Sequence, residues 1–144
     1  MLVKQVRSIL DGETDPIVAM ANASAAIFYS LPDLNWAGFY RVIGGDLVLG
    51  PFQGKVACTR IKRGKGVCGT ALETGLSQLV PDVHAFPGHI ACDSASRSEI
   101  VVPLHRDGEV TAVLDIDSPL LARFTEEDAE GLAALAGTLE RIIR

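Results

Sequence analysis

The residues of this chain best suited to chemistry are its three cysteines, Cys58, Cys68 and Cys92. A thiolate is a good nucleophile, and its oxidation to a sulfenic acid is reversible. Cys92 stands among polar residues rather than in an apolar run, and His89 and Arg97 nearby would favour its thiolate form. Gathered at one site, the three thiols would supply a nucleophile and resolving partners; otherwise each is an ordinary core or loop thiol.

The spacing of the cysteines argues against two other uses of thiols. No two of them form a C-x-x-C pair, which excludes a thioredoxin-like redox motif. A structural zinc site would need His84 or His89 as a fourth ligand. Its ligands would then come from scattered segments, whereas structural zinc sites favour short paired spacings. We therefore expect no metal site.

A glycine pattern, Gly64-x-Gly66-x-x-Gly69, matches the dinucleotide-binding fingerprint literally. That fingerprint needs a strand–helix–strand unit in a parallel sheet, whereas this chain has the turn signals of hairpins. The glycines are better interpreted as the entry to a helix. A P-loop is excluded as well, because Gly66 stands where Ser or Thr is required. We expect no cofactor.

Three acidic residues form a second candidate group. Asp115 and Asp117 are two residues apart in a strongly apolar strand, so both should point to the same face. They would repel each other unless they meet water or a cationic ligand, and exposure at the strand end is the simpler alternative. Glu99, at the start of another strand, could join them. Trp36, the only tryptophan, could form the wall of an apolar pocket or simply belong to the core.

Composition limits the class of protein. The chain has 144 residues, of which 48% are hydrophobic, so it can bury a sizeable core as a single domain spanning residues 1–144. A net charge of −5 argues against nucleic acid and anionic membranes as partners. No apolar run is long enough to span a bilayer, and the N-terminus lacks the features of a signal peptide. These features, with an odd number of cysteines, predict a cytoplasmic protein.

Apolar periodicity and turn residues indicate the elements that must position these side chains. Helices are expected over residues 2–11, 16–30, 64–74 and from 125 to the C-terminus. Strands are expected over residues 36–42, 47–50, 56–61, 77–80, 99–105 and 110–117. Because tight hairpins join most of the strands, the prediction is an α+β fold with a central antiparallel sheet of about six strands. The helices should pack mainly on one face.

The long segment from Val80 to Glu99 follows neither a helical nor a strand period. A compact domain rarely keeps such an irregular stretch unless it is disordered or functional. Phe86, Ile90 and the turn at residues 87–88 give it apolar anchors, which argues against disorder. We interpret it as an ordered active-site or binding loop that presents Cys92.

Taken together, these residues resemble the free methionine-(R)-sulfoxide reductase family, which is built on a GAF-type domain. The resemblance covers nearly the whole chain, and the family's cysteine spacing is present as Cys58, Cys68 and Cys92. No motif position departs from the family pattern. The most specific segments are Asn35-Trp36-Ala37-Gly38-Phe39-Tyr40, Gly64-Lys65-Gly66-Val67-Cys68-Gly69, residues 80–94, and Leu114-Asp115-Ile116-Asp117-Ser118.

The resemblance implies that the substrate is free L-methionine (R)-S-oxide. Cys92 would attack the sulfoxide sulfur while Glu99 protonates the departing oxygen. The sulfenic acid would then form a disulfide with Cys58, which we favour, or with Cys68 as a relay or substitute. A thioredoxin-type dithiol would restore the enzyme, and a homodimer is expected.

The resemblance also implies a set of substrate-binding residues. Glu99, Asp115 and Asp117 would bind the α-ammonium group, which carries a charge only in the free amino acid. Trp36 would pack on the S-methyl group, with Tyr40 lining the same pocket.

Two alternatives stay open at this stage. The chain could be a GAF module that senses a small molecule without catalysis, although its acids would repel a phosphate and the sensory branch is not expected to carry these cysteines. Within the enzyme hypothesis, Cys68 rather than Cys92 could be the nucleophile, because the sequence does not say which thiol acts first.

Overall fold

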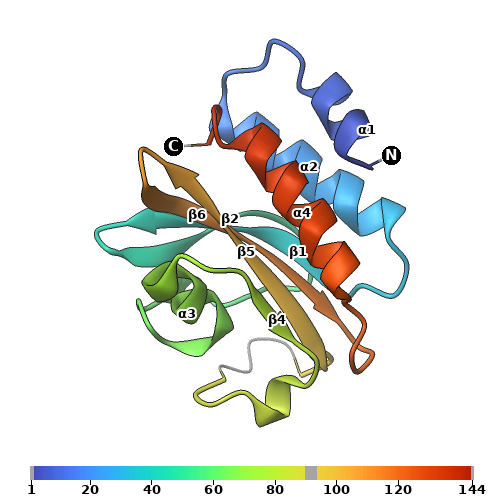
Figure 1. Ribbon diagram of the computed structural model, residues 1–144, viewed down its shortest axis with the longest axis vertical. Helices are drawn as coiled ribbons and strands as arrows, with labels where there is room; N and C mark the ends of the chain where they lie inside the picture. The colour runs from blue at the N-terminus through green and yellow to red at the C-terminus, as the bar shows by residue number, and fades with distance from the viewer. Residues whose placement is uncertain (1, 90–93, 144) are drawn as a thin grey trace.

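The computed structural model describes residues 2–89 and 94–143. Figure 1 shows one sheet with helices on both sides of it. The helices are α1 (Leu2–Ile9), α2 (Pro16–Ser30), α3 (Gly66–Thr74), the short 3₁₀ helix η1 (Val83–Ala85) and α4 (Glu126–Leu139). The strands are β1 (Trp36–Ile43), β2 (Asp46–Gly54), β3 (Arg60–Ile61), β4 (Gln78–Val80), β5 (Ser98–Arg106) and β6 (Glu109–Ser118).

The six strands lie in the order β3-β2-β1-β6-β5-β4, and every neighbouring pair is antiparallel. The hairpins β1–β2 and β5–β6 are local, whereas the pairing of β1 with β6 joins the two halves of the chain in the middle of the sheet. The predicted α+β class with a six-stranded antiparallel sheet is confirmed.

The two faces of the sheet are covered differently. Helices α1, α2 and α4 pack on one face, as Figure 1 shows, over an apolar core that includes Phe39, Ile100 and Leu114. Helix α3 covers part of the opposite face, where a second apolar cluster includes Tyr40, Val67 and Val113. None of the helices in the described part of the chain combines the length and apolar character needed to cross a bilayer.

Local signals explain why several elements begin and end where predicted. Asp15 caps α2, because its Oδ1 accepts a hydrogen bond from the backbone N–H of Ile17 at 2.8 Å. Thr125 and Asp128 form a reciprocal capping box at the start of α4. The tight turn of the β5–β6 hairpin is formed by Asp107 and Gly108, both with positive φ.

Several predicted element bounds differ from the structure. The strand expected over residues 56–61 is reduced to Arg60–Ile61. Before it the chain leaves the ladder, and the Tyr40 hydroxyl donates a hydrogen bond to the carbonyl of Cys58. Helix α4 ends at Leu139 rather than at the C-terminus. The irregular segment after β4 contains η1, whose Val83 is fully buried.

Candidate active site

The candidate site lies on the α3 face of the sheet, where neighbouring strands align side chains in rows. Trp36 of β1 is the register partner of Asp117 of β6, and Asp117 is also the partner of Glu99 of β5. Asp115 pairs with Gly38 in the next row on this face. Because residues two apart on a strand share a face, both aspartates point to the same side as Trp36 and Glu99. The predicted common face of the two aspartates is confirmed.

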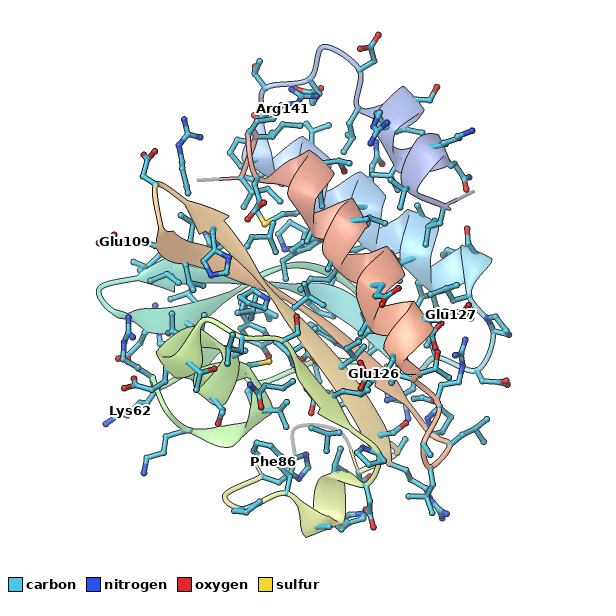
Figure 2. The ribbon with its side chains drawn as sticks, in the orientation of Figure 1. Lys62, Phe86, Glu109, Glu126, Glu127 and Arg141 are labelled. Atoms are coloured by element: carbon cyan, nitrogen blue, oxygen red, sulfur yellow. The ribbon has the colours of Figure 1, made fainter. Side chains whose placement is uncertain are left out.

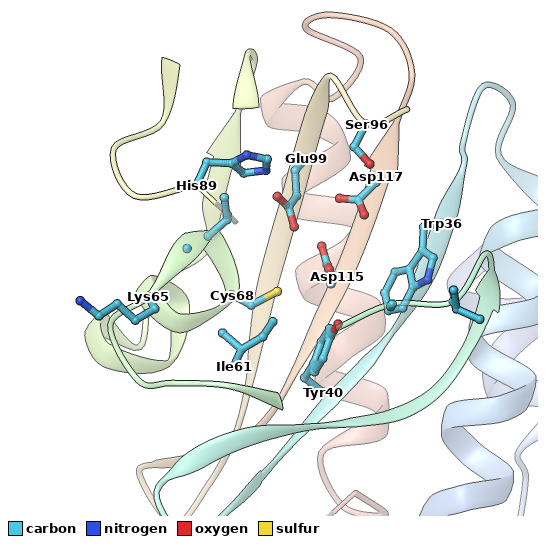
Figure 3. A pocket seen from close by; sticks show the side chains of 14 residues that line it. Trp36, Tyr40, Ile61, Lys65, Cys68, His89, Ser96, Glu99, Asp115 and Asp117 are labelled. Atoms are coloured by element: carbon cyan, nitrogen blue, oxygen red, sulfur yellow. The ribbon is translucent and has the colours of Figure 1, made fainter. Parts of the chain in front are cut away.

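A pocket opens on this face, and Figure 3 shows side chains from distant segments pointing into it. It brings together six of the predicted catalytic and substrate-binding residues: Trp36, Tyr40, Cys68, Glu99, Asp115 and Asp117. The other lining residues come from the segment around β3, the start of α3 and the loop before β5: Val56, Ala57, Ile61, Lys65, Gly66, Val67, His89 and Ser96. Strands β1, β5 and β6 thus form one wall, and α3 forms another.

The polar centre of the pocket is a buried cluster of Cys68, Glu99 and Asp115. The sulfur and one carboxylate oxygen from each acid all lie within 4.8 Å of one another. Asp115 Oδ1 is buried and has no hydrogen-bond partner among the described residues. Neither Glu99 nor Asp115 forms an ion pair with a lysine or arginine in that part of the chain. Burying carboxylates without a cation is costly, so the pocket favours a positively charged ligand.

The environment of the cluster changes the acidity of its members. Burial raises the pKa of Glu99 well above its ordinary value, and the charges of Asp115 and Asp117 raise this pKa further. The pKa of Asp115 is also raised by burial, although hydrogen bonds with Glu99 and Cys68 lower it in part. Glu99 is therefore suited to hold a proton that a reaction could use.

The same environment acts on the thiol of Cys68. Burial raises its pKa well above the ordinary value, and the negative charge of Asp115 raises it further. The thiol therefore keeps its proton, whereas a nucleophilic cysteine works as a thiolate. This argues against Cys68 as the residue that attacks first.

Aromatic rings form the wall of the pocket on the β1–β2 side. The Trp36 ring stacks against Phe52 and Tyr40, with ring centroids 5.1 Å and 6.0 Å away. Its Nε1 donates a hydrogen bond to the backbone carbonyl of Lys55 at 3.1 Å. Gly38 makes room for this arrangement, because a Cβ there would lie 2.3 Å from Phe52 Cβ and 2.9 Å from Trp36 Cη2. The tryptophan is thus held rigidly with one part exposed to the pocket.

The N-terminus of α3 supplies the opposite kind of polarity. Gly66 and Val67 occupy the first turn of the helix and line the pocket. The N–H groups of a first turn have no partner within the helix, and the helix dipole adds partial positive charge there. Lys65, at the N-cap position, contributes no side-chain capping bond. A small anionic group such as a carboxylate would suit this end of the pocket.

Two of the three cysteines, Cys58 and Cys68, lie within the described residues. Cys68 is a free, buried thiol. Cys58 is disulfide-bonded; it follows Ala57, a residue of the pocket wall, and its carbonyl accepts the hydrogen bond of the Tyr40 hydroxyl at 2.9 Å. Cys92 lies outside the described residues, as does the expected anchor Ile90. The predicted convergence of three thiols therefore stays a prediction.

The sequence analysis did not single out Ser96, which lines the pocket and is buried. Asn35 Nδ2 donates a hydrogen bond to Ser96 Oγ at 3.0 Å. The next residue, Arg97, donates its backbone N–H to the carbonyl of Ser118 at 2.8 Å. These two hydrogen bonds hold the loop before β5 against the start of β1 and the end of β6. Asn35 begins one of the quoted motifs, but nothing in the local sequence distinguishes Ser96 from any other loop serine.

Comparison with known proteins places this geometry in a family. The GAF domain model matches residues 5–143. The Bacillus subtilis protein YtsP is 54% identical over 99% of this chain and 89% of its own length. The Escherichia coli free methionine-R-sulfoxide reductase is 50% identical over 99% of this chain and 86% of its own length.

A solved structure agrees with these relatives. It is the free methionine-R-sulfoxide reductase from Neisseria meningitidis in complex with its substrate, which is 48% identical, with a TM-score of 0.96 over 99% of this chain and 86% of that one. The chain described above therefore belongs to the GAF domain family, together with relatives named free methionine-R-sulfoxide reductase.

Proposed function

We propose that this protein reduces free L-methionine (R)-S-oxide to L-methionine. The observation that carries the proposal is the buried pair Glu99 and Asp115, which lacks a basic partner among the described residues and lies between an aromatic wall and a helix N-terminus. The relatives named free methionine-R-sulfoxide reductase support the same activity.

The pocket suits a free amino acid better than a residue in a peptide. The α-ammonium group would be held by Glu99, Asp115 and Asp117 and would compensate their charge. A peptide nitrogen carries no charge, so a peptide would leave the buried acids Glu99 and Asp115 uncompensated. The α-carboxylate would bind at the N-terminus of α3, next to Gly66 and Val67.

The side chain of the substrate would extend along the aromatic wall. Trp36 would pack on the S-methyl group, and Tyr40 would line the same part of the pocket. Burial, together with the charge of Asp115, raises the pKa of Tyr40, so its hydroxyl stays protonated and keeps its hydrogen bond to Cys58.

In the proposed reaction, the thiolate of Cys92 attacks the sulfoxide sulfur and Glu99 donates a proton to the sulfoxide oxygen. Methionine leaves, and the oxygen ends on Cys92 as a sulfenic acid. The thiol of Cys58 then attacks that sulfur, which forms a disulfide and releases water. A thioredoxin-type dithiol transfers its two electrons to the disulfide and restores both thiols. The disulfide-bonded state of Cys58 and the free thiol of Cys68 support Cys58 as the resolving residue.

The test is a chiral assay with purified protein, free methionine sulfoxide and dithiothreitol. We expect the R epimer to be consumed and the S epimer to be spared, and we expect Cys92→Ser to abolish turnover. N-acetyl-methionine (R)-sulfoxide serves as the control for a peptide-like nitrogen, because its acetylated nitrogen carries no charge. Equal activity on both compounds would refute ammonium recognition, and binding without turnover would favour the sensor alternative.

The resolving step needs a separate measurement. With thioredoxin as reductant, we expect Cys58→Ser to form one equivalent of methionine and then stop, whereas Cys68→Ser continues to turn over. The opposite result would exchange the roles of the two residues.

The finer features of the proposal concern the setting of the enzyme. We propose that it works in the cytoplasm as a homodimer, reduced by a thioredoxin-type partner. Its free thiol and cysteine usage are compatible with a reducing compartment. Equilibrium sedimentation would test the dimer, and a comparison of thioredoxin with glutathione in the assay would test the reductant.

A further inference from the structure

The polar centre of the pocket has the composition of a metal site. Cys68 contributes a sulfur from α3, Glu99 an oxygen from β5 and Asp115 an oxygen from β6, and these three atoms lie within 4.8 Å of one another. Each of the three residues is at least nine-tenths buried. Oxygen ligands alone would suit Mg²⁺ or Ca²⁺, whereas a thiolate beside carboxylates selects an ion of borderline softness such as Zn²⁺.

A second observation points to a ligand at this place. Asp115 Oδ1 is buried without a hydrogen-bond partner among the described residues, and Figure 3 shows the Asp115 carboxylate directed into the pocket beside Glu99 and Cys68. No basic side chain of the described part forms an ion pair with Glu99 or Asp115. An uncompensated, buried acceptor beside a thiol is a ready site for a cation.

We propose that the pocket binds one Zn²⁺ ion through Cys68 Sγ and one oxygen each from Glu99 and Asp115, and that the bound ion excludes the substrate. On binding, the Cys68 thiol loses its proton to solvent and forms the zinc–sulfur bond, with no change of oxidation state. Water fills the fourth position, as in zinc sites with three protein ligands.

The geometry needs a small adjustment to hold the ion. Tetrahedral zinc with bonds near 2.0–2.3 Å places its ligand atoms about 3.3–3.7 Å apart. The three donor atoms lie within 4.8 Å of one another, so they must approach by at most about 1–1.5 Å, which a rotation of the Cys68 or Glu99 side chain can provide. This site differs from the structural zinc site considered in the sequence analysis, because it uses one cysteine and two acids and occupies the ligand pocket.

The inhibitory consequence rests on the proposed function. The carboxylates that would hold the α-ammonium group are the same ones that would hold the ion, so zinc and free methionine sulfoxide cannot be bound together. Zinc should therefore inhibit competitively, with a half-inhibiting concentration that increases with substrate concentration.

Metal binding is tested without turnover. The full-length protein, reduced with a phosphine that does not bind the ion strongly, is titrated with Co²⁺, whose bond to a thiolate gives a charge-transfer absorption band. We expect one equivalent of Co²⁺ with this band, displaced by Zn²⁺. Cys68→Ala should abolish the band and weaken zinc affinity at least tenfold, and Cys68→Ser should do the same. Circular dichroism checks that both variants fold.

Matched variants locate the ion. Cys58→Ala should keep the band, because Cys58 is not a ligand in this proposal, and Asp115→Asn should weaken zinc affinity. A band that persists in both folded Cys68 variants, or one that Cys58→Ala removes, would overturn the assignment. So would the absence of any bound Co²⁺ at equimolar, micromolar protein and metal.

The two proposals fail in different ways. If free methionine (R)-sulfoxide displaces Co²⁺ and N-acetyl-methionine (R)-sulfoxide does not, the shared site is supported. If Co²⁺ binds through Cys68 but no sulfoxide is reduced, the reductase function fails and the metal site stands. If the sulfoxide is reduced and no ion binds, the metal inference alone is overturned.

Discussion

Glu99 and Asp117 lie directly opposite each other on the antiparallel strands β5 and β6, so two acidic side chains form one cross-strand pair. Like charges in that position destabilise a sheet. Asp115 adds a third carboxylate nearby, and burial together with this acidic surrounding raises the pKa of Glu99. This cluster of acids lowers the stability of the protein when the pocket is empty, and a bound cation would compensate their charge. Substitutions in the cluster should therefore change both ligand binding and the free energy of unfolding.

Replacing Glu99 by Gln should increase stability and decrease activity. The substitution removes a buried acid whose ionisation is disfavoured in the folded protein, so we expect the free energy of unfolding at pH 8 to rise by on the order of 1–3 kcal/mol. It also removes the proposed general acid, so kcat/KM for the free sulfoxide should fall by roughly 10²-fold or more. Urea denaturation and steady-state kinetics measure the two effects. Glu130→Gln, on the exposed side of α4, is the control and should change neither; a loss of stability in Glu99→Gln would contradict the argument.

The raised pKa of Glu99 also predicts a pH dependence. The folded protein binds this proton more tightly than the unfolded chain, whose carboxyl has the ordinary pKa of 4.5. Its contribution to stability is therefore fully present below pH 4.5 and is lost as the pH rises through the folded-state pKa. Asp115 shifts in the same direction. As the pH rises from 4 to 8, the free energy of unfolding of the wild type should fall relative to that of Glu99→Gln. A difference that does not vary with pH would count against a buried, coupled Glu99.

Gly38→Ala tests the close packing beneath the tryptophan. The new Cβ would lie 2.3 Å from Phe52 Cβ, so strand β1 or β2 must shift. We expect a loss of about 1–3 kcal/mol or more in the free energy of unfolding, together with a higher KM because Trp36 moves.

A matched glycine gives the control for this substitution. Gly131, inside α4, has no atom within 4 Å of the position of an added Cβ. Gly131→Ala should therefore stabilise the protein by about 0.5–1 kcal/mol. Thermal or urea unfolding of the two variants should move in opposite directions, and a stabilised Gly38→Ala would show that the strand pair is not tightly packed.

Trp36→Phe should separate binding from folding. The variant keeps an aromatic ring but loses the hydrogen bond from Nε1 to Lys55, which contributes about 1 kcal/mol. The smaller ring leaves space beside the methyl group of the substrate, so KM should increase roughly fivefold with little change in kcat. Tyr29→Phe, at a residue that is 78% exposed, is the control. An unchanged KM in Trp36→Phe would place the substrate elsewhere in the pocket.

Much of the fold could be predicted because its signals are local. The caps at Asp15 and Thr125 and the turn at Asp107 and Gly108 depend on residues close in sequence, and they bound helices and strands that were predicted within a few residues of their observed ends. Strand alternation likewise placed Asp115 and Asp117 on one face. The strand expected around Cys58 was wrong because its length depends on pairing with the distant strand β2, and only Arg60 and Ile61 pair with that strand.

The composition of the site depends on contacts between residues that are far apart in the sequence. The sequence pattern named Cys68, Glu99 and Asp115 as candidates. It did not show that α3 packs against β5 and β6, which brings one sulfur and two carboxylates together in a buried cluster. The same packing raises the pKa of the Cys68 thiol, which is how the structure argues against it as the nucleophile. The expected roles of Cys92 and the extent of the domain over residues 1–144 stay predictions.

The sequence by itself therefore determined the kinds of groups available, the helices and hairpins, and the face on which each acid would lie, because residue type and local periodicity control these. The tertiary structure alone decided which groups meet, how deeply they are buried and how strongly they hold their protons. Burial and charge act between residues that are far apart along the chain and close together only after folding.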